Sequence, residues 1–305
     1  MNVPARMLVF GAGGQVGRAL LAHAAGDGWQ ATGLDRAALD IARSADVARA
    51  IADARPSVVV NAAAYTAVDA AESDRDAAFA VNADAPGAIA AACARAGIAL
   101  IHISTDYVFD GRKETPYAED DAIAPLGVYG KSKAAGERAV RDVTPRHVVL
   151  RTAAVFDGQG RNFVRTMLRL AAERPTLRVV ADQRTCPTAA ADIAVAIAAI
   201  GRRLADAPSA ESFGTFHFCG APATTWHGFA EAILDAAARR GWPRPAVEAI
   251  ATADYPTPAR RPARSMLDCG KIARVYGIAQ PDWRPALEDA VAALTAEPAA
   301  RKAST

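Results

Sequence analysis

The amino-acid sequence predicts an α/β fold, in which helices are wound on both faces of a mostly parallel sheet and a smaller mixed α/β region follows. Short apolar strands alternate with helical segments through the first half of the chain, as in βαβ units with right-handed crossovers. The strands lack a polar alternation, which is typical of parallel strands covered on both faces. A glycine-rich turn directly follows the first strand.

Each element of the first half is predicted from its local pattern. Continuous apolar runs predict strands at residues 7–10, 30–34, 57–61, 99–104 and 147–150. Helical spacing of apolar residues predicts helices at 15–25, 46–54, 77–96 and 127–140. Pro86, near the middle of the third helix, predicts a kink or a division into two helices. Ligands bind beyond the carboxyl ends of such strands, so the residues that follow them are expected to line a site.

The second half of the chain is less regular. Helices are predicted at 162–172 and 191–204 and a strand at 215–219, and Thr225 is a plausible N-cap for a further helix. Residues 243–262 are rich in Pro and Arg, so an irregular segment is expected there. A disordered tail is expected at 297–305.

Composition and charge exclude several classes of protein. The chain has 305 residues, 51% of them hydrophobic, and its 35 basic and 33 acidic residues are interspersed, so no nucleic-acid partner is expected. No signal peptide and no run of ~20 uninterrupted apolar residues is recognisable, so no membrane partner is expected. The four cysteines show no C-x-x-C pair and no histidine at metal-ligand spacing, which predicts reduced, mostly buried thiols in a cytoplasmic protein.

The glycine-rich turn predicts a Rossmann-type site for a dinucleotide. Its glycines follow the stride Gly11-x-x-Gly14-x-x-Gly17, so the backbone can turn tightly and a diphosphate can approach it closely. The helix that begins there presents free N–H groups and the positive end of its dipole. The turn residues predicted to bind the cofactor are Gly11, Gly14, Gln15, Val16 and Gly17.

The end of the second strand leaves the choice of cofactor open. Asp35 lies ~20 residues beyond the turn, where a carboxylate binds the ribose hydroxyls of NAD. Arg36 could instead pair with the 2′-phosphate of NADP. Asp40 and Ile41 are predicted either to flank the adenine or to begin a helix. The expected cofactor is therefore NADPH or NADH.

A tyrosine and a lysine share one face of the helix predicted at 127–140. Tyr129 and Lys133 are four residues apart, so both side chains can point into the same cleft. An ammonium beside a phenol lowers its pKa, which makes the phenol a general acid for a ketone oxygen. Lys133 can also hold the nicotinamide ribose, and Thr105, after the fourth strand, can hydrogen-bond the same carbonyl.

Together these residues resemble the extended short-chain dehydrogenases/reductases, and more narrowly the dTDP-4-dehydrorhamnose reductase family. The resemblance runs from the N-terminus to about residue 270, and Ser-Thr-Asp-Tyr-Val-Phe-Asp-Gly at 104–111 is its most specific block. The other matching blocks lie at 61–69, 125–133, 150–152 and 255–262.

The resemblance implies the last step of dTDP-L-rhamnose synthesis, which serves lipopolysaccharide and O-antigen formation. NADPH or NADH would reduce the 4-keto group of a dTDP-sugar, with Tyr129 as proton donor, its pKa lowered by Lys133, and Thr105 on the carbonyl. Tyr129, Lys133, Ala64, Tyr65 and Thr66 would contact the cofactor. Thr105 and Asp106 would contact the sugar.

Two further pairs of residues suit the diphosphate of the sugar nucleotide. Arg260 and Arg261 could bind phosphate bidentately, or could lie in a solvated Pro-rich loop. Asn162 and Phe163 could present N–H groups to the same diphosphate, or could be an ordinary helix start. We therefore expect a dinucleotide-binding domain at 1–155, to which about 190–210 returns, and a mainly substrate-binding region at 156–296.

Two departures from the family pattern carry predictions. Ala154 stands where the family often has Trp beside the sugar, which puts sugar specificity in question. Some members bind Mg²⁺ at a dimer interface through glutamates, and the matching positions here are Ala19 and Ala191, which cannot ligate a metal. No metal is therefore expected, and the chain is expected to be a monomer or a weak homodimer without a metal bridge.

Two other functions remain open. The first is an epimerase or dehydratase of the same superfamily, although Tyr107 replaces the acid that related dehydratases usually carry after Thr-Asp. The second is a regulatory subunit that binds NADP without turnover, which the intact Thr105, Tyr129 and Lys133 argue against. The sequence leaves the nucleobase undetermined.

Overall fold

A six-stranded sheet lies at the centre of the computed structural model, which describes residues 5–296. Every pair of neighbouring strands in it is parallel. Its order is β10-β5-β4-β3-β1-β2, so the direction of winding reverses between β1 and β3, where ligands of such sheets bind. The predicted α/β, Rossmann-type sheet is confirmed. The strands are β1 (Arg6–Phe10), β2 (Gln30–Leu34), β3 (Val58–Asn61), β4 (Ala99–Thr105), β5 (His147–Thr152) and β10 (Gly214–His217).

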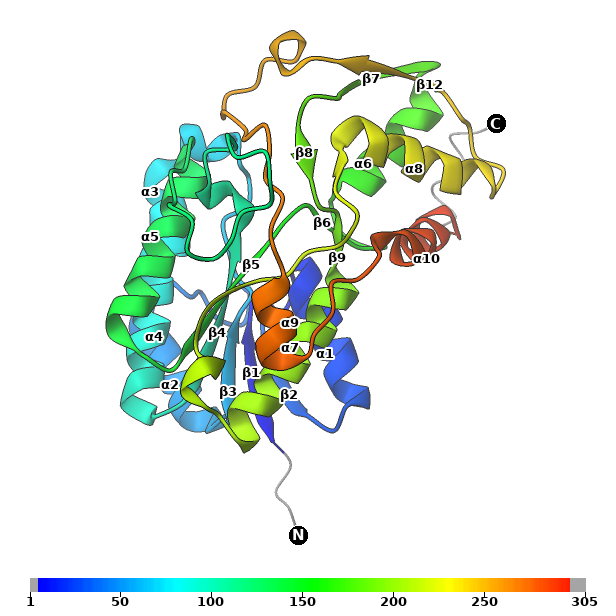
Figure 1. Ribbon diagram of the computed structural model, residues 1–305. Helices are drawn as coiled ribbons and strands as arrows, with labels where there is room; N and C mark the ends of the chain where they lie inside the picture. The colour runs from blue at the N-terminus through cyan, green and yellow to red at the C-terminus, as the bar shows by residue number, and fades with distance from the viewer. Residues whose placement is uncertain (1–4, 297–305) are drawn as a thin grey trace.

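Helices cover both faces of this sheet (Figure 1). Alternate residues of each strand point to opposite faces, so Val9 belongs to the core beneath α1 and α7, whereas Leu8 belongs to the core beneath α2, α4 (Ala85–Ala96) and α5. α7 follows the short strands of residues 155–189 in sequence and packs on α1 of the first half of the chain. The helices are α1 (Gln15–Gly26), α2 (Ser44–Ala54), α5 (Val128–Val143), α7 (Ala190–Asp206) and, packed on α7, α9 (Gly270–Tyr276).

The helix predicted at 77–96 is divided, as Pro86 indicated. α3 (Arg75–Phe79) continues through a π-helical turn, Ala80–Asp84, into α4 (Ala85–Ala96), with Pro86 in the first turn of α4, where its missing N–H is not needed. Taken together, Arg75–Ala96 is long and apolar enough to cross a membrane by length and composition alone, but half of its most apolar window is buried inside the fold. Asn82, in the π turn, hydrogen-bonds the backbone of Tyr65 and the hydroxyl of Ser132, which ties the segment to α5.

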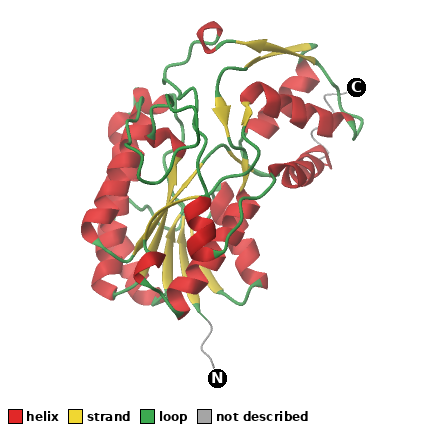
Figure 2. Cartoon of the chain, in the orientation of Figure 1, coloured by secondary structure: helices red, strands yellow, loops and turns green. Residues whose placement is uncertain are grey.

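The remaining elements form a smaller mixed region beside the carboxyl edge of the sheet (Figures 1 and 2). Its core centres on Phe229, which packs against Phe156, Phe163 and Trp283. Thr225 caps α8 as predicted, since its side chain accepts a hydrogen bond of 3.0 Å from the Gly228 N–H. The helices are α6 (Phe163–Glu173), α8 (Trp226–Ala238) and α10 (Trp283–Ala296); the strands are β6 (Val155–Phe156), β7 (Thr176–Val180), β8 (Arg184–Thr185), β9 (Thr188–Ala189), β11 (Thr224–Thr225) and β12 (Ala246–Ile250).

One prediction for this region is wrong. Residues 243–262 were expected to be irregular, but they contain β12, which pairs in parallel with β7 over five residues. Most of β12 is exposed, so its sequence carries only a weak apolar pattern. The strand forms because its backbone pairs with β7, which lies seventy residues earlier in the chain. The tail predicted at 297–305 lies outside the described residues.

Candidate active site

A cleft of about 1010 Å³ opens along the carboxyl edge of the sheet, where the site was predicted. It is large enough for a dinucleotide and part of a second ligand. Gly17, Phe163, Arg260 and Arg261 are the predicted site residues that do not line it. The predicted residues that do line it are Gly11, Gly14, Gln15, Val16, Asp35, Arg36, Asp40, Ile41, Ala64, Tyr65, Thr66, Thr105, Asp106, Tyr129, Lys133 and Asn162.

The glycine-rich turn packs so closely on neighbouring backbone that Gly11 and Gly17 could not carry side chains. Because these positions have none, the backbone N–H groups of the turn stay accessible to a phosphate. Gly11 has φ +81°, and a Cβ there would lie 2.4 Å from the Ala63 nitrogen. A Cβ at Gly17 would lie 2.2 Å from the Gly11 oxygen, so a glycine at this position allows α1 to pack on the turn. Gly14 is the N-cap of α1 and has no side-chain hydrogen bond over the helix end, which suits an anion such as the cofactor diphosphate.

The adenosine side of the predicted cofactor site lies at the end of β2. Asp35 Oδ1 accepts hydrogen bonds from the Ala37 and Ala38 N–H groups at 3.0 and 2.9 Å, so this carboxylate also holds the turn after β2. α2 begins at Ser44, and Asp40 therefore precedes the helix and lines the cleft, which favours the first of its two predicted roles.

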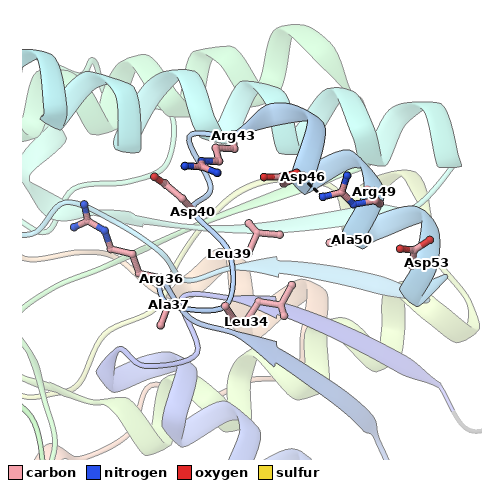
Figure 3. Close-up of a pocket in the computed structure, with 11 residues that line it drawn as sticks. Leu34, Arg36, Ala37, Leu39, Asp40, Arg43, Asp46, Arg49, Ala50 and Asp53 are labelled. Carbon is pink, nitrogen blue, oxygen red and sulfur yellow. Dashed lines mark hydrogen bonds and ion pairs between the residues drawn. The ribbon is translucent and has the colours of Figure 1, made fainter.

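A side groove of about 570 Å³ extends from the cleft beyond Asp35. Figure 3 shows Arg36 and Arg43 on either side of Asp40, all three along the wall of this groove. Farther along, Arg49 is paired with Asp46 at 2.5 Å. The groove thus has a mixed charge, and it offers cations where the 2′-phosphate of NADP was predicted to bind.

Two distant contacts fix the first turn of α5, which carries Tyr129. The Val128 N–H donates to Glu72 Oε1 at 2.7 Å, so a residue from before α3 caps the helix. Gly130 packs on the backbone of Tyr107, and a Cβ there would lie 2.2 Å from the Tyr107 oxygen. The Tyr107 and Tyr129 rings meet edge to face with centroids 5.8 Å apart. Tyr129 is thereby held at the inner end of the cleft, next to Thr105.

Burial controls the protonation of Tyr129 and Lys133. Burial raises the pKa of Tyr129 to about 12, with a smaller lowering by the side-chain hydrogen bond with Thr105 and a raising by the Asp106 charge. Burial lowers the pKa of Lys133 to about 8, and the Glu137 charge opposes that shift. Lys133 Nζ donates to the Ile103 carbonyl at 2.7 Å. Lys133 is not among the groups that shift the pKa of Tyr129 in this arrangement, so its predicted effect on the phenol stays a prediction.

Thr105 and Asp106 form a buried polar pair at the end of β4. The Thr105 hydroxyl donates to Asp106 Oδ1 at 2.9 Å and accepts from the Tyr107 N–H at 3.1 Å. Burial raises the pKa of Asp106 to about 6, while hydrogen bonds from Ser265 and Thr105 lower it. Both side chains line the cleft beside Tyr129, where the sugar was predicted to bind.

Sequence reasoning missed a buried ion pair directly behind these residues. Glu137, one turn after Lys133 on α5, accepts from Arg151 Nε at 2.9 Å and from Arg151 Nη2 at 2.7 Å. Ser104 Oγ also donates to Glu137 Oε1 at 2.6 Å, and Arg141 adds a bond of 3.1 Å from the surface side. The spacing from Tyr129 to Lys133 to Glu137 is four residues each, so one helix face carries all three. That spacing was the available signal.

The residues predicted for the sugar-nucleotide diphosphate are divided between the cleft and its surroundings. Asn162 lines the cleft and caps α6, accepting from the Arg165 N–H at 3.1 Å, whereas Phe163 packs on Trp226 with ring centroids 4.8 Å apart. Arg261 forms a two-bond ion pair with Asp69, at 3.0 and 2.8 Å. Arg260 is exposed. The structure therefore brings Asn162 to the cleft and leaves Phe163, Arg260 and Arg261 outside its lining.

Other features bear on the remaining predictions. Ala154 lines the cleft with φ +43°, a left-handed conformation that residues other than glycine adopt at a cost. All four cysteines are buried and free, as predicted, and the fold brings Cys219 and Cys269 together with sulfur atoms 3.7 Å apart, which their spacing did not indicate. Over residues 5–296, no group of three or more His, Cys, Asp or Glu side chains is arranged to hold a metal ion.

Comparisons with known proteins agree with this geometry. Residues 5–296 match the family described as RmlD substrate binding domain. The chain is 46% identical over 292 residues to a dTDP-4-dehydrorhamnose reductase of Sinorhizobium fredii, which covers 96% of this chain and 98% of that protein. It is 41% identical over 292 residues to a probable dTDP-4,6-dihydroxy-2-methyloxan-3-one 4-ketoreductase of Streptomyces antibioticus, which covers 93% and 94%. The structure of the Bacillus anthracis dTDP-4-dehydrorhamnose reductase in complex with NADP is similar with a TM-score of 0.87 at 33% identity, covering 94% of this chain and 98% of that one.

Proposed function

The chain belongs to the dTDP-4-dehydrorhamnose reductase family, and from that membership we propose that it reduces the 4-keto group of dTDP-4-dehydro-L-rhamnose to give dTDP-L-rhamnose. The cofactor is NADPH or NADH. One observation carries the proposal: Tyr129 and Lys133 line the inner end of a cleft whose other wall is the glycine-rich turn, so a dinucleotide and a ketone can meet there.

In the proposed reaction Tyr129 donates the proton. The bound cofactor supplies the hydride to the carbonyl carbon. Because burial raises the pKa of Tyr129 to about 12, the phenol stays protonated at neutral pH and can donate to the carbonyl oxygen as negative charge develops there. The Thr105 hydroxyl, beside it, is the second contact to that oxygen. Lys133, a cation below about pH 8, holds the nicotinamide ribose and favours the phenolate that remains.

We assign the substrate side to the residues nearest Tyr129. Asp106 accepts from a sugar hydroxyl, and Asn162 and Phe163 begin the helix that faces the substrate diphosphate. Arg261 and Arg260 lie in the loop beside the start of α5: the Arg260 oxygen is 3.8 Å from an ideal Cβ on Gly127, and Asp69 now neutralises Arg261. Release of Arg261 from Asp69 by a phosphate would make it a substrate contact. Residues 156–296 supply most of this side, with 1–155 and about 190–210 forming the dinucleotide side.

A second keto sugar deserves a test because of one residue. Ala154 leaves space in the cleft wall, and a relative at 41% identity is named as a ketoreductase of a different dTDP-sugar. We propose dTDP-4-dehydro-L-rhamnose as the substrate and treat other dTDP-4-keto sugars as the alternative. The proposed setting is the cytoplasm, where buried free thiols stay reduced, with the chain acting as a monomer or weak homodimer that needs no metal.

The experiment is the consumption of NADPH and of NADH with the dTDP-4-keto-6-deoxy-L-sugar prepared in situ, followed by absorbance and by product identification. Rapid consumption with formation of dTDP-L-rhamnose supports the proposal and ranks the two cofactors. Turnover only with another dTDP-4-keto sugar would replace the substrate. Tight cofactor binding without turnover of any keto sugar would favour a regulatory subunit. A preference for UDP-sugars over dTDP-sugars would contradict the assignment of thymine as the nucleobase.

A further inference from the structure

The loop between β6 and α6, residues 157–162, packs directly against the glycine-rich turn. Asn162 Nδ2 donates to Gln15 Oε1 at 3.0 Å, and Arg18 pairs with Asp157 at 3.0 Å. A Cβ on Gly160 would lie 2.8 Å from Gln15 Cγ, so the backbone of the loop lies directly against the Gln15 side chain. Residues from both halves of the chain therefore form one wall of the cleft at the place where a diphosphate would meet the turn.

Two arginines lie on this wall, and their surroundings differ. Arg18 is engaged, since its guanidinium pairs with Asp157 and also donates to the Gly13 carbonyl. Asp157 is held in turn by the N–H groups of Gln159 and Gly160, at 3.1 and 2.6 Å, so this carboxylate is fixed in place to neutralise Arg18. Arg161 lines the cleft, is exposed, and has no ion-pair or hydrogen-bond partner within residues 5–296.

A diphosphate at the turn needs more positive charge than the turn itself supplies. The free N–H groups and the dipole of α1 offer only about half an elementary charge, whereas the diphosphate of a dinucleotide carries two negative charges. A guanidinium binds two phosphate oxygens at once, through parallel N–H···O bonds. Arg18 is already neutralised, so Arg161 is the cation of this wall that is available to a ligand.

We propose that Arg161 binds the diphosphate of the dinucleotide cofactor, opposite the N–H groups of the glycine-rich turn. The inference rests on the proposed function in taking a nicotinamide dinucleotide as the ligand. Arg161 lies within the loop that Asp157 and Asn162 fasten to the turn, so its backbone needs no rearrangement to face a bound phosphate. It thereby adds a contact from the second half of the chain to a cofactor held mainly by the first.

The test measures binding, independently of turnover. The dissociation constant of NADPH is determined by fluorescence titration for the wild type, Arg161→Ala, Arg161→Lys and the control Arg169→Ala. Arg169 lies on α6 in an exposed ion pair with Glu173, so its removal changes the net charge equally but touches no residue of the cleft. We expect Arg161→Ala to raise the dissociation constant of NADPH about tenfold and Arg161→Lys to raise it less. Arg169→Ala should change this constant less than twofold.

Two further measurements make the outcome decisive. Raising the salt concentration should weaken the binding of NADPH less in Arg161→Ala than in the wild type, since the variant has lost one charged contact to phosphate. The same variants are titrated with dTDP, which carries the other diphosphate that could reach the loop. Equal NADPH affinity in Arg161→Ala and Arg169→Ala, or a loss confined to dTDP, overturns the inference. A wild type that binds no dinucleotide at all would instead contradict the proposed function.

Discussion

At the scale of single residues, burial decides which groups at the inner end of the cleft carry a proton. Tyr129 has a raised pKa of about 12 and Asp106 a raised pKa of about 6, each because its charged form is poorly solvated. Lys133 has a lowered pKa of about 8 for the same reason. Near neutral pH the phenol is therefore neutral, the ammonium charged and the carboxyl mostly ionised, which is the combination that a proton donor beside a ketone requires.

The first prediction concerns the proton donor. Tyr129→Phe removes the hydroxyl and keeps the ring that packs on Tyr107, so kcat should fall by a factor of about 10²–10⁴. The dissociation constant of NADPH should change little, because the ring and Lys133 remain. Steady-state kinetics and fluorescence titration check the two quantities separately. A variant that retained its kcat, or lost its cofactor affinity, would remove Tyr129 from the proposed role.

A second prediction concerns cofactor choice. Asp35 Oδ1 holds the turn after β2 through two backbone N–H groups, so Asp35→Ala would disturb both cofactors, whereas Asp35→Asn keeps the acceptor and removes only the charge. We expect Asp35→Asn to weaken the binding of NADH about five- to tenfold and to leave the binding of NADPH nearly unchanged. The reason is that a carboxylate binds the ribose diol of NADH and repels the 2′-phosphate of NADPH. Arg36→Ala should do the reverse. Equal losses for both cofactors in each variant would contradict the assignment.

Asp106 links stability to pH. Its pKa rises from 3.8 in the unfolded chain to about 6 in the fold, so the folded state binds the extra proton between these values. Its contribution to the free energy of unfolding is therefore full below about pH 4 and is lost as the pH rises through 6. Asp106→Asn lacks this titration and should be more stable than the wild type at neutral pH, by up to about 3 kcal/mol, while losing activity.

Urea denaturation between about pH 4 and pH 7 measures this effect directly. The wild type should lose stability across that range relative to Asp106→Asn, and the difference should grow with pH. Asp142→Asn, which removes an exposed carboxylate from α5, is a suitable control. A constant difference between wild type and Asp106→Asn at every pH would show that hydrogen bonding, not burial of the charge, governs this carboxyl.

At the scale of elements, helix α5 is aligned on strand β4 by side chains one turn apart. Lys133 donates to the Ile103 carbonyl, and Glu137 accepts from the Ser104 hydroxyl while pairing with Arg151 on β5. These contacts fix the rotation and register of the helix against the strand that ends in Thr105. The geometry of Tyr129 beside Thr105 is therefore a property of the packed pair of elements and not of either alone.

The prediction at this scale concerns the buried ion pair. Glu137→Gln leaves the Arg151 guanidinium buried without a counter-charge, which should reduce the free energy of unfolding by about 3–5 kcal/mol. Glu173→Gln, which breaks an exposed pair with Arg169, should cost less than about 1 kcal/mol. Glu137→Gln combined with Arg151→Met should recover much of the loss, because both charges are then removed. A small effect of Glu137→Gln, no larger than that of Glu173→Gln, would contradict this account.

At the scale of the whole molecule, the two halves of the chain share both a core and a wall. α7, from the second half, packs on α1 of the first, and the loop at 157–162 is fastened to the glycine-rich turn. A ligand in the cleft therefore contacts both halves. We expect thermal unfolding to be a single transition, and NADPH at a hundred times its dissociation constant to stabilise the fold by about 2.7 kcal/mol.

Calorimetry with and without NADPH tests this coupling. The expected result is one transition that moves as a whole to higher temperature. Two transitions, of which only one moves, would mean that the halves unfold independently and that the shared wall contributes little to stability. Arg18→Ala, which breaks the ion pair with Asp157, then identifies how much of the coupling that contact supplies.

Interactions between residues close in sequence determine most of the fold of the first half of the chain. The parallel strands and the glycine-rich turn follow from apolar runs and steric limits, which act within a few residues, and Pro86 correctly indicated an irregular helix between Arg75 and Ala96. Because strand ends in such a sheet meet at one edge, most of the predicted cofactor residues line the same cleft. The activity was implied by resemblance in short blocks, whereas the roles of Tyr129, Lys133 and Thr105 were predicted from their positions and chemistry before that resemblance was considered.

The tertiary structure decided what depends on partners far away in the chain. β12 exists because β7 offers a backbone to pair with, and its own sequence carries little apolar pattern. Arg261, which was predicted for the diphosphate, is paired with Asp69, whereas Arg161, which no sequence pattern singled out, has no partner among residues 5–296 and lines the cleft. Charge pairing and burial are properties of a three-dimensional neighbourhood. The sequence names the groups that can react, and only packing decides which of them are neutralised, buried or free.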